Sequence, residues 1–194
     1  MNKLERISVI LGDVALPLIG YLFWNWNFYF ILLFFLFDQA SRVFFLPWRM
    51  KLTEITLMER KVLFYKQLLY FTLEIIIVHV AIFLQNQQID FKHEIYAFLA
   101  YEDMGIQQGF VLLPLVFASE WMRIKNESKI GITGEKQSVL ISKNIKNTLI
   151  RVAFFGILAA LLNCVSIPEW GLVVMFLILI TIILLFSGFT TNKI

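Results

Sequence analysis

Six long apolar runs constrain the fold of this chain more than any other feature. A helix needs roughly 20 apolar residues to cross the hydrocarbon core of a bilayer, within a range of roughly 17 to 25. The fourth run is shorter than this and the first contains polar residues, so five spans remain an alternative. The pattern predicts an all-α bundle of six transmembrane helices in a single domain, 1–194, with spans at about 7–24, 28–46, 67–85, 110–124, 149–167 and 171–189.

The composition makes lipid the main solvent of this chain. Hydrophobic residues make up 59% of it and charged residues 16%, with a mean hydropathy of +0.76. Soluble domains contain about 45–50% apolar and about 25% charged residues. The net charge of +3 is not taken as a sign of nucleic-acid binding, because the basic residues lie beside the apolar runs, as membrane orientation requires.

The distribution of lysine and arginine predicts the orientation. These residues collect in the cytoplasmic segments of membrane proteins. If the amino terminus is inside, Lys92 is the only one of the 17 basic residues that lies outside. This asymmetry is hard to obtain with an odd number of spans. We therefore predict a multi-pass protein of the bacterial cytoplasmic (inner) membrane with both termini in the cytoplasm and a first span that is retained.

The connecting segments are of two kinds. The external turns at 25–27 and 168–171 are very short, so spans 1 and 2, and spans 5 and 6, are expected to be antiparallel neighbours. The segment 52–66 is predicted either to extend span 3 or to lie on the anionic leaflet as an amphipathic helix. The external segment 90–103 has one apolar face and is expected to lie at the interface or to bind a partner. The internal segment 125–147 is predicted to be a mobile loop with at most one short helix.

Charged residues inside the predicted spans are the candidate functional site. A charge at the middle of a span costs about 2.5 to 3.5 kcal/mol on insertion scales, so such residues face the bundle interior and pair. Counted from the cytoplasmic ends, four acids from four spans fall in one layer, with three arginines at or just below it. Arg42 follows Asp38 by four residues and Arg123 follows Glu120 by three, spacings that place acid and base on one helix face. The predicted layer consists of Asp13, Asp38, Arg42, Glu74, Glu120, Arg123 and Arg151.

This layer has two interpretations. It is either an ion-paired network that fixes helix packing or a proton or cation site in a transporter. In span 1, Pro17 and Gly20 continue the helix face of Asp13, so this stripe is expected to pack against protein. His79 lies deeper in span 3 and is expected to be a hydrogen-bonded core histidine rather than a proton relay.

Catalytic and cofactor signatures are absent from the sequence. It contains no serine-hydrolase elbow, no His-Glu-x-x-His, no P-loop and no dinucleotide fingerprint. The two histidines, His79 and His93, do not support a zinc site of usual composition. Cys164 is the only cysteine, so an internal disulfide is impossible, and it is expected to be a small buried hydrophobic residue. We predict no catalytic residue, no cofactor and no metal.

The first 45 residues contain three neighbouring motifs: Pro17-Leu-Ile-Gly20, the aromatic turn Phe23-Trp24-Asn25-Trp26, and the acid-amide pair Asp38-Gln39. On these motifs, the segment resembles a family of uncharacterised six-span membrane proteins of bacteria and archaea. The family has a Pro-Leu-x-Gly element, an aromatic turn and a Glu-Asn pair at the corresponding places. The resemblance implies the six-span architecture and no activity.

The sequence thus favours a non-enzymatic membrane protein that acts by association, as an accessory or assembly subunit of a larger membrane complex. Its expected partners are the lipid bilayer and other integral membrane subunits, with anionic lipid at the cytoplasmic face. One alternative is a small proton- or cation-coupled transporter that uses the intramembrane acids. A third is a lipid-binding or lipid-modifying protein that uses the cytoplasmic arginines.

Overall fold

The protein is a bundle of long helices. The computed structural model describes residues 15–53, 55–100, 102–103, 106–129 and 134–189. Within these residues the all-α prediction is confirmed, and the only strands are a two-residue antiparallel pair in which Glu102 is opposite Gln107. The elements are α2 (Leu16–Phe23), α3 (Phe28–Lys51), α4 (Leu57–Gln85), α5 (Phe91–Ala100), β1 (Glu102–Asp103), β2 (Ile106–Gln107), α6 (Gln108–Lys129), α7 (Glu135–Leu162) and α8 (Glu169–Phe189).

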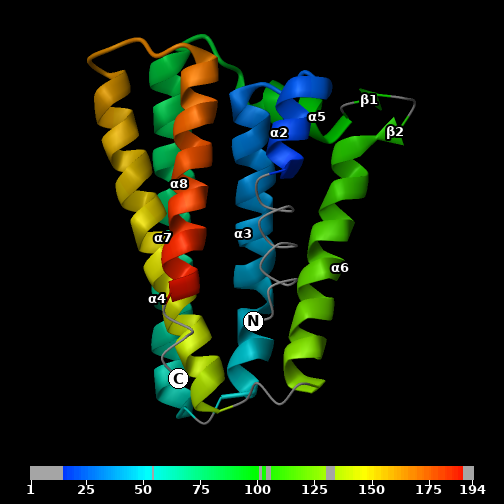
Figure 1. Ribbon diagram of the computed structural model, residues 1–194, viewed down its shortest axis with the longest axis vertical. Helices are drawn as coiled ribbons and strands as arrows, with labels where there is room; N and C mark the ends of the chain where they lie inside the picture. The colour runs from blue at the N-terminus through cyan, green and yellow to red at the C-terminus, as the bar shows by residue number, and fades with distance from the viewer. Residues whose placement is uncertain (1–14, 54, 101, 104–105, 130–133, 190–194) are drawn as a thin grey trace.

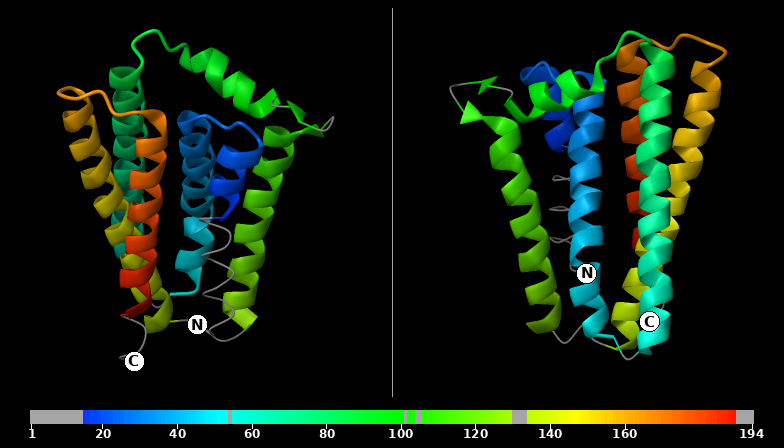
Figure 2. Two further views of the ribbon diagram at one scale, coloured as in Figure 1. Left: turned by 45° about the horizontal axis from the view of Figure 1, so that its top comes forward. Right: turned by 180° about the vertical axis from the view of Figure 1, so that it is seen from behind.

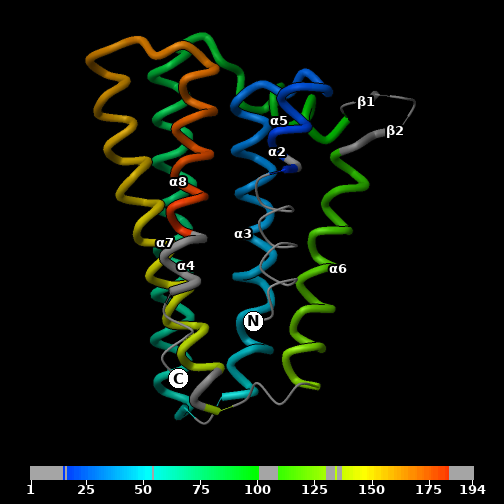
Figure 3. The backbone as a smooth tube through the Cα atoms, viewed as in Figure 1, coloured from blue at the N-terminus to red at the C-terminus, as the bar shows by residue number. Residues whose placement is uncertain are grey.

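Helix α3 is the centre of the bundle. It contacts every other helix of the described chain, with α4, α7 and α8 on one side and α2 and α6 on the other (Figure 1). The backbone trace shows the same division: along most of its length, α6 lies on the opposite side of α3 from α4, α7 and α8 (Figure 3). Helices α4 and α7 form the most extensive contact. Polar residues of α3 are therefore well placed to join the two sides.

Three of the described helices are long and apolar enough to cross a membrane: Phe28–Lys51, Leu57–Gln85 and Gln137–Leu162. Within α8, residues Glu169–Ile183 form a shorter apolar segment. These helices are those of a membrane protein. The count of six spans and the side on which the termini lie remain predictions.

The structure decides between the two interpretations of 52–66. Helix α4 runs unbroken from Leu57, so residues 57–66 extend span 3 rather than forming a separate surface helix. A capping box begins it: the Thr56 hydroxyl accepts from the Glu59 backbone N–H, and the Glu59 carboxylate accepts from that of Thr56. Two reciprocal hydrogen bonds satisfy N–H groups that a helix start otherwise leaves unpaired.

The prediction of a mobile loop over 125–147 is wrong. Helix α6 continues to Lys129 and α7 begins at Glu135. The segment is helical because one face of α7 is buried. Buried residues, both polar and apolar, recur every three or four positions along this helix, beginning with Gln137 and Ile141. They are Gln137, Ile141, Ile145, Thr148, Arg151, Phe155, Leu158 and Leu162.

Helix α5 crosses one end of the bundle between α4 and α6 (Figure 2). It is anchored by Phe98, which is 2% exposed and packs against the rings of Trp26, Phe30 and Phe37. The acidic side of α5 also binds the bundle, since the Glu94 carboxylate accepts from Asn27, the N-cap of α3. The segment that was predicted to be external is thus part of the folded core at that end.

The outer surface is strongly apolar. Ten large hydrophobic side chains of α4 alone are exposed, which a helix in water does not tolerate but a helix in lipid requires. Cys164 is also exposed, contrary to the prediction that it is buried. Helix α7 ends at Leu162 rather than at 167, so this cysteine lies in the turn that follows the helix.

Candidate functional site

Arg151 of α7 is the centre of a buried polar network. Its guanidinium donates from Nε to Glu74 Oε1 at 2.6 Å and from Nη2 to the Gln39 side-chain oxygen at 2.9 Å and to the Thr148 hydroxyl at 2.9 Å. Arg151 is 5% exposed and Glu74 0%. The guanidinium also lies over the Phe35 ring, 5.2 Å from its centroid. One arginine therefore joins α3, α4 and α7.

The network extends along α3 through the acid-amide pair. Gln39 donates to Asp38 at 3.2 Å, and Asp38 forms an ion pair with Arg42 at 2.7 Å. This is the helix-face pair that the four-residue spacing predicts. On the other side, Gln67 of α4 donates to the Thr148 hydroxyl at 3.0 Å. We call Asp38, Gln39, Arg42, Gln67, Glu74, Thr148 and Arg151 the Arg151 network.

A second, partly buried network joins α3, α6 and α7. Arg49 binds Glu127 through two hydrogen bonds of 2.9 and 3.1 Å and lies 3.3 Å from Glu120. Arg123 pairs with Glu120 at 2.9 Å, again as its spacing predicts. Gln137 donates to Glu127 at 3.4 Å. These five residues are the Arg49 network.

The predicted layer of acids is thus divided. Contacts among the described residues place Asp38 and Glu74 in one network and Glu120 in the other. Asp13 lies outside the described residues, so its expected contact with span 2 is not described.

Several members of the networks were not predicted. Arg49 and Glu127 fell in segments that hydropathy assigned to cytoplasmic loops. A search for intramembrane charges does not find the uncharged members, which are Gln39, Gln67, Thr148 and Gln137. A helical-face pattern could have found Glu127, because it follows Glu120 by seven residues and Arg123 by four.

His79 forms the hydrogen-bonded core contact that was expected. Its Nδ1 donates to the carbonyl of Ile75 at 2.8 Å, since a carbonyl only accepts, and its Nε2 therefore accepts from the Tyr29 hydroxyl at 3.0 Å. The rings of Tyr29 and Phe91 pack on the imidazole. Both ring nitrogens are engaged.

The small-residue stripe of α2 packs against protein. Pro17 and Gly20 are both buried. A Cβ atom added to Gly20 would overlap the ring of Trp26, and the Gly20 carbonyl accepts from the backbone N–H groups of Trp24 and Trp26. The glycine therefore allows the aromatic turn to fold back onto α2.

Charge is balanced across the two networks. Four arginines meet four carboxylates, and each of these eight groups has an ion-pair partner: Arg42, Arg49, Arg123 and Arg151 with Asp38, Glu74, Glu120 and Glu127. Both oxygens of Glu74 accept from Arg151. Ion pairs between helices of this kind link the helices that contribute them.

The cavity lined by Gln39, Arg42 and Gln67, in the Arg151 network, is small, with a volume of about 10 Å³. Small-molecule sites are typically about 300–1,000 Å³. Among the described residues no three or more His, Cys, Asp or Glu side chains gather where they could hold a metal ion.

No protein-family model, curated protein or solved structure matches this chain. The likeness of its first 45 residues to a six-span family stays a prediction.

Proposed function

We propose that this protein is a non-enzymatic, six-span protein of the bacterial inner membrane, with both termini in the cytoplasm, and that it acts as an accessory or assembly subunit of a larger membrane complex. The observation that carries the proposal is the pairing of the charged residues in its two networks. Arg151 and Arg49 each bind acceptors from other helices. The polar interior is therefore used for packing.

The distribution of exposed charge supports the proposed orientation. Six exposed lysines lie in the halves of α3, α4, α6 and α7 that are nearer the end where α3 and α6 finish and α4 and α7 begin; Figure 1 shows this end of the helices. At the opposite end of the described chain, Lys92 is the exposed lysine. The six are Lys51, Lys61, Lys66, Lys125, Lys129 and Lys146.

Helix lengths support the proposed membrane position. Helix α3 has 24 residues and α4 has 29, so at about 1.5 Å per residue they are roughly 36 and 43 Å long. The hydrocarbon core is about 30 Å thick. The first turns of α4 then lie at headgroup level, where exposed Met58 and Val62 face the acyl boundary and Lys61 and Lys66 face anionic lipid.

The test is the mass of the intact assembly. The full chain, carrying an affinity tag and extracted from its own membrane in a mild detergent, is expected to give a native mass spectrum of the chain bound to other membrane subunits in a fixed ratio. An unrelated tagged six-span protein from the same membrane is the control. A monomer that carries ions across liposomes would overturn the proposal.

The transporter remains the second candidate because of one observation. Asp38 and Arg42 are the most accessible pair of the Arg151 network, with side chains 24% and 23% exposed. Proton-coupled transport through Asp38 requires Asp38→Asn to abolish dye-detected proton flux in liposomes. Our proposal predicts that the wild type, Asp38→Asn and the control Glu94→Gln all match empty liposomes.

A further inference from the structure

The carbonyl oxygen of the Gln67 side chain is the starting observation. Gln67 is 6% exposed, and its Nε2 donates to Thr148. Its Oε1 is buried and has no hydrogen-bond partner among the described residues. Buried polar atoms are almost always paired with protein or with ordered water, so this oxygen requires a donor.

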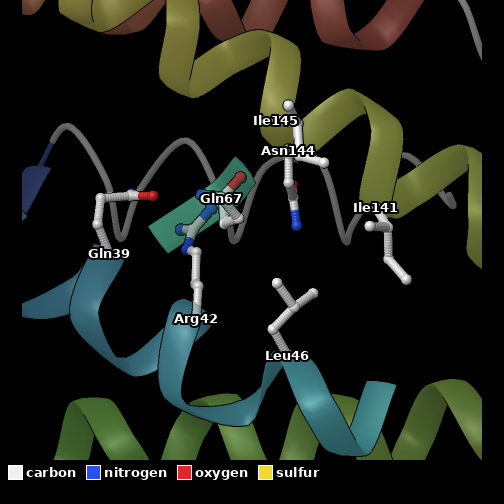
Figure 4. Close-up of a pocket in the computed structure, with 7 residues that line it drawn as sticks. All are labelled: Gln39, Arg42, Leu46, Gln67, Ile141, Asn144 and Ile145. Carbon is white, nitrogen blue, oxygen red and sulfur yellow. The ribbon is translucent and has the colours of Figure 1, made fainter. Parts of the chain in front are cut away.

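A cavity of about 10 Å³ adjoins Gln67, between α3, α4 and α7. The side chain of Arg42 points into it from α3 and that of Asn144 from α7, while Leu46, Ile141 and Ile145 form its apolar wall (Figure 4). A volume of about 10–15 Å³ on this scale holds one water molecule. Arg42 and Asn144 bring N–H groups to the same space.

We infer that this cavity binds a single ordered water molecule, which donates a hydrogen bond to Gln67 Oε1 and lies beside Arg42 and Asn144. A metal cation is disfavoured by the guanidinium of Arg42. An anion is not attracted, because Asp38 neutralises that guanidinium at 2.7 Å, and chloride is larger than water. The bound water links all three helices and hydrates the Asp38–Arg42 pair.

The test is X-ray hydroxyl-radical labelling of the full-length protein in detergent. Radicals form from bound water and oxidise the side chains beside it. Ile141 lines the cavity and Ile31 lies in the core, and both are isoleucines with 0% exposure. Ile141 is expected to be oxidised at least threefold faster than Ile31. Equal rates in the wild type overturn the inference.

A variant and a structure complete the test. Gln67→Met removes the oxygen that holds the water, and the oxidation of Ile141 is expected to fall to the rate of Ile31. A persistently high rate at Ile141 in a folded Gln67→Met protein contradicts the assignment. In crystals grown with bromide, density within hydrogen-bond distance of Gln67 Oε1 and without anomalous signal supports water, whereas an anomalous peak shows an anion and overturns it.

Discussion

At the scale of single residues, Arg151 explains why charges are tolerated inside this bundle. A buried ion is costly unless its partners are in place, and Arg151 has Glu74, Gln39 and Thr148 within hydrogen-bond distance and Phe35 beneath its guanidinium plane. The glutamine and the threonine add acceptors that the acid alone does not supply, because an arginine has five N–H groups to satisfy.

Arg151→Met is expected to lower the free energy of unfolding by about 3–5 kcal/mol, because it leaves the Glu74 carboxylate buried without its partner. The double variant Glu74→Leu, Arg151→Met removes both charges and is expected to recover at least half of that loss. Unfolding in an SDS titration, followed by tryptophan fluorescence, measures both. Lys146→Met, an exposed substitution on the same helix, is the control and is expected to stay within about 0.5 kcal/mol of the wild type.

A double variant no more stable than Arg151→Met would contradict this account. It would show that Arg151 stabilises the bundle through Gln39 and Thr148 rather than through the ion pair.

At the scale of elements, the close approach of α2 to the aromatic turn depends on one glycine. Gly20 has no room for a Cβ beneath the Trp26 ring, whereas a Cβ at Gly156 of α7 meets nothing within 4 Å. Two glycines in predicted spans thus have opposite roles: one permits contact, and the other only weakens its helix.

Gly20→Ala is expected to lower the free energy of unfolding by about 1–3 kcal/mol, because the ring of Trp26 must move. Gly156→Ala is expected to raise it by about 0.5–1 kcal/mol, because alanine loses less conformational entropy in a helix. The SDS titration compares the two directly. If both substitutions stabilise the protein, α2 does not pack on Trp26 in the membrane.

At the scale of the whole molecule, the proposed six-span orientation places successive connections on alternate sides of the membrane. Proteins with a single cysteine test this orientation. One is the wild type, with Cys164, and the others carry Lys61→Cys, Gln87→Cys or Lys129→Cys in a Cys164→Ser background; all four positions are exposed. A membrane-impermeant maleimide added to intact cells with an opened outer membrane is expected to label 87 and 164 but to label 61 and 129 only after the inner membrane is permeabilised. Labelling of 61 and 87 from the same side would exclude α4 as a span.

The sequence predicted the class of the fold and the local pairs of the site. Apolar runs of membrane length and four-residue spacings are local properties, so the helical architecture and the Asp38–Arg42 and Glu120–Arg123 pairs follow from position along one helix. The helix ends were less predictable, since α4 and α7 begin well before their apolar runs. Hydropathy does not place the start of a helix whose first turns mix polar and apolar residues, as at 137–145, where the helix has one buried face.

Only the tertiary structure decided how the charges are shared. Depth counted along the predicted spans places Asp38, Glu74 and Glu120 at similar levels. This count does not show which helices are neighbours. The central position of α3 does: it brings Gln39 to Arg151 on one side and Arg49 to Glu120 on the other. The sequence by itself determined that this chain forms apolar helices with charged residues inside them. Packing alone decided that those charges form two networks, because a buried charge is satisfied by whichever polar groups the neighbouring helices bring within reach.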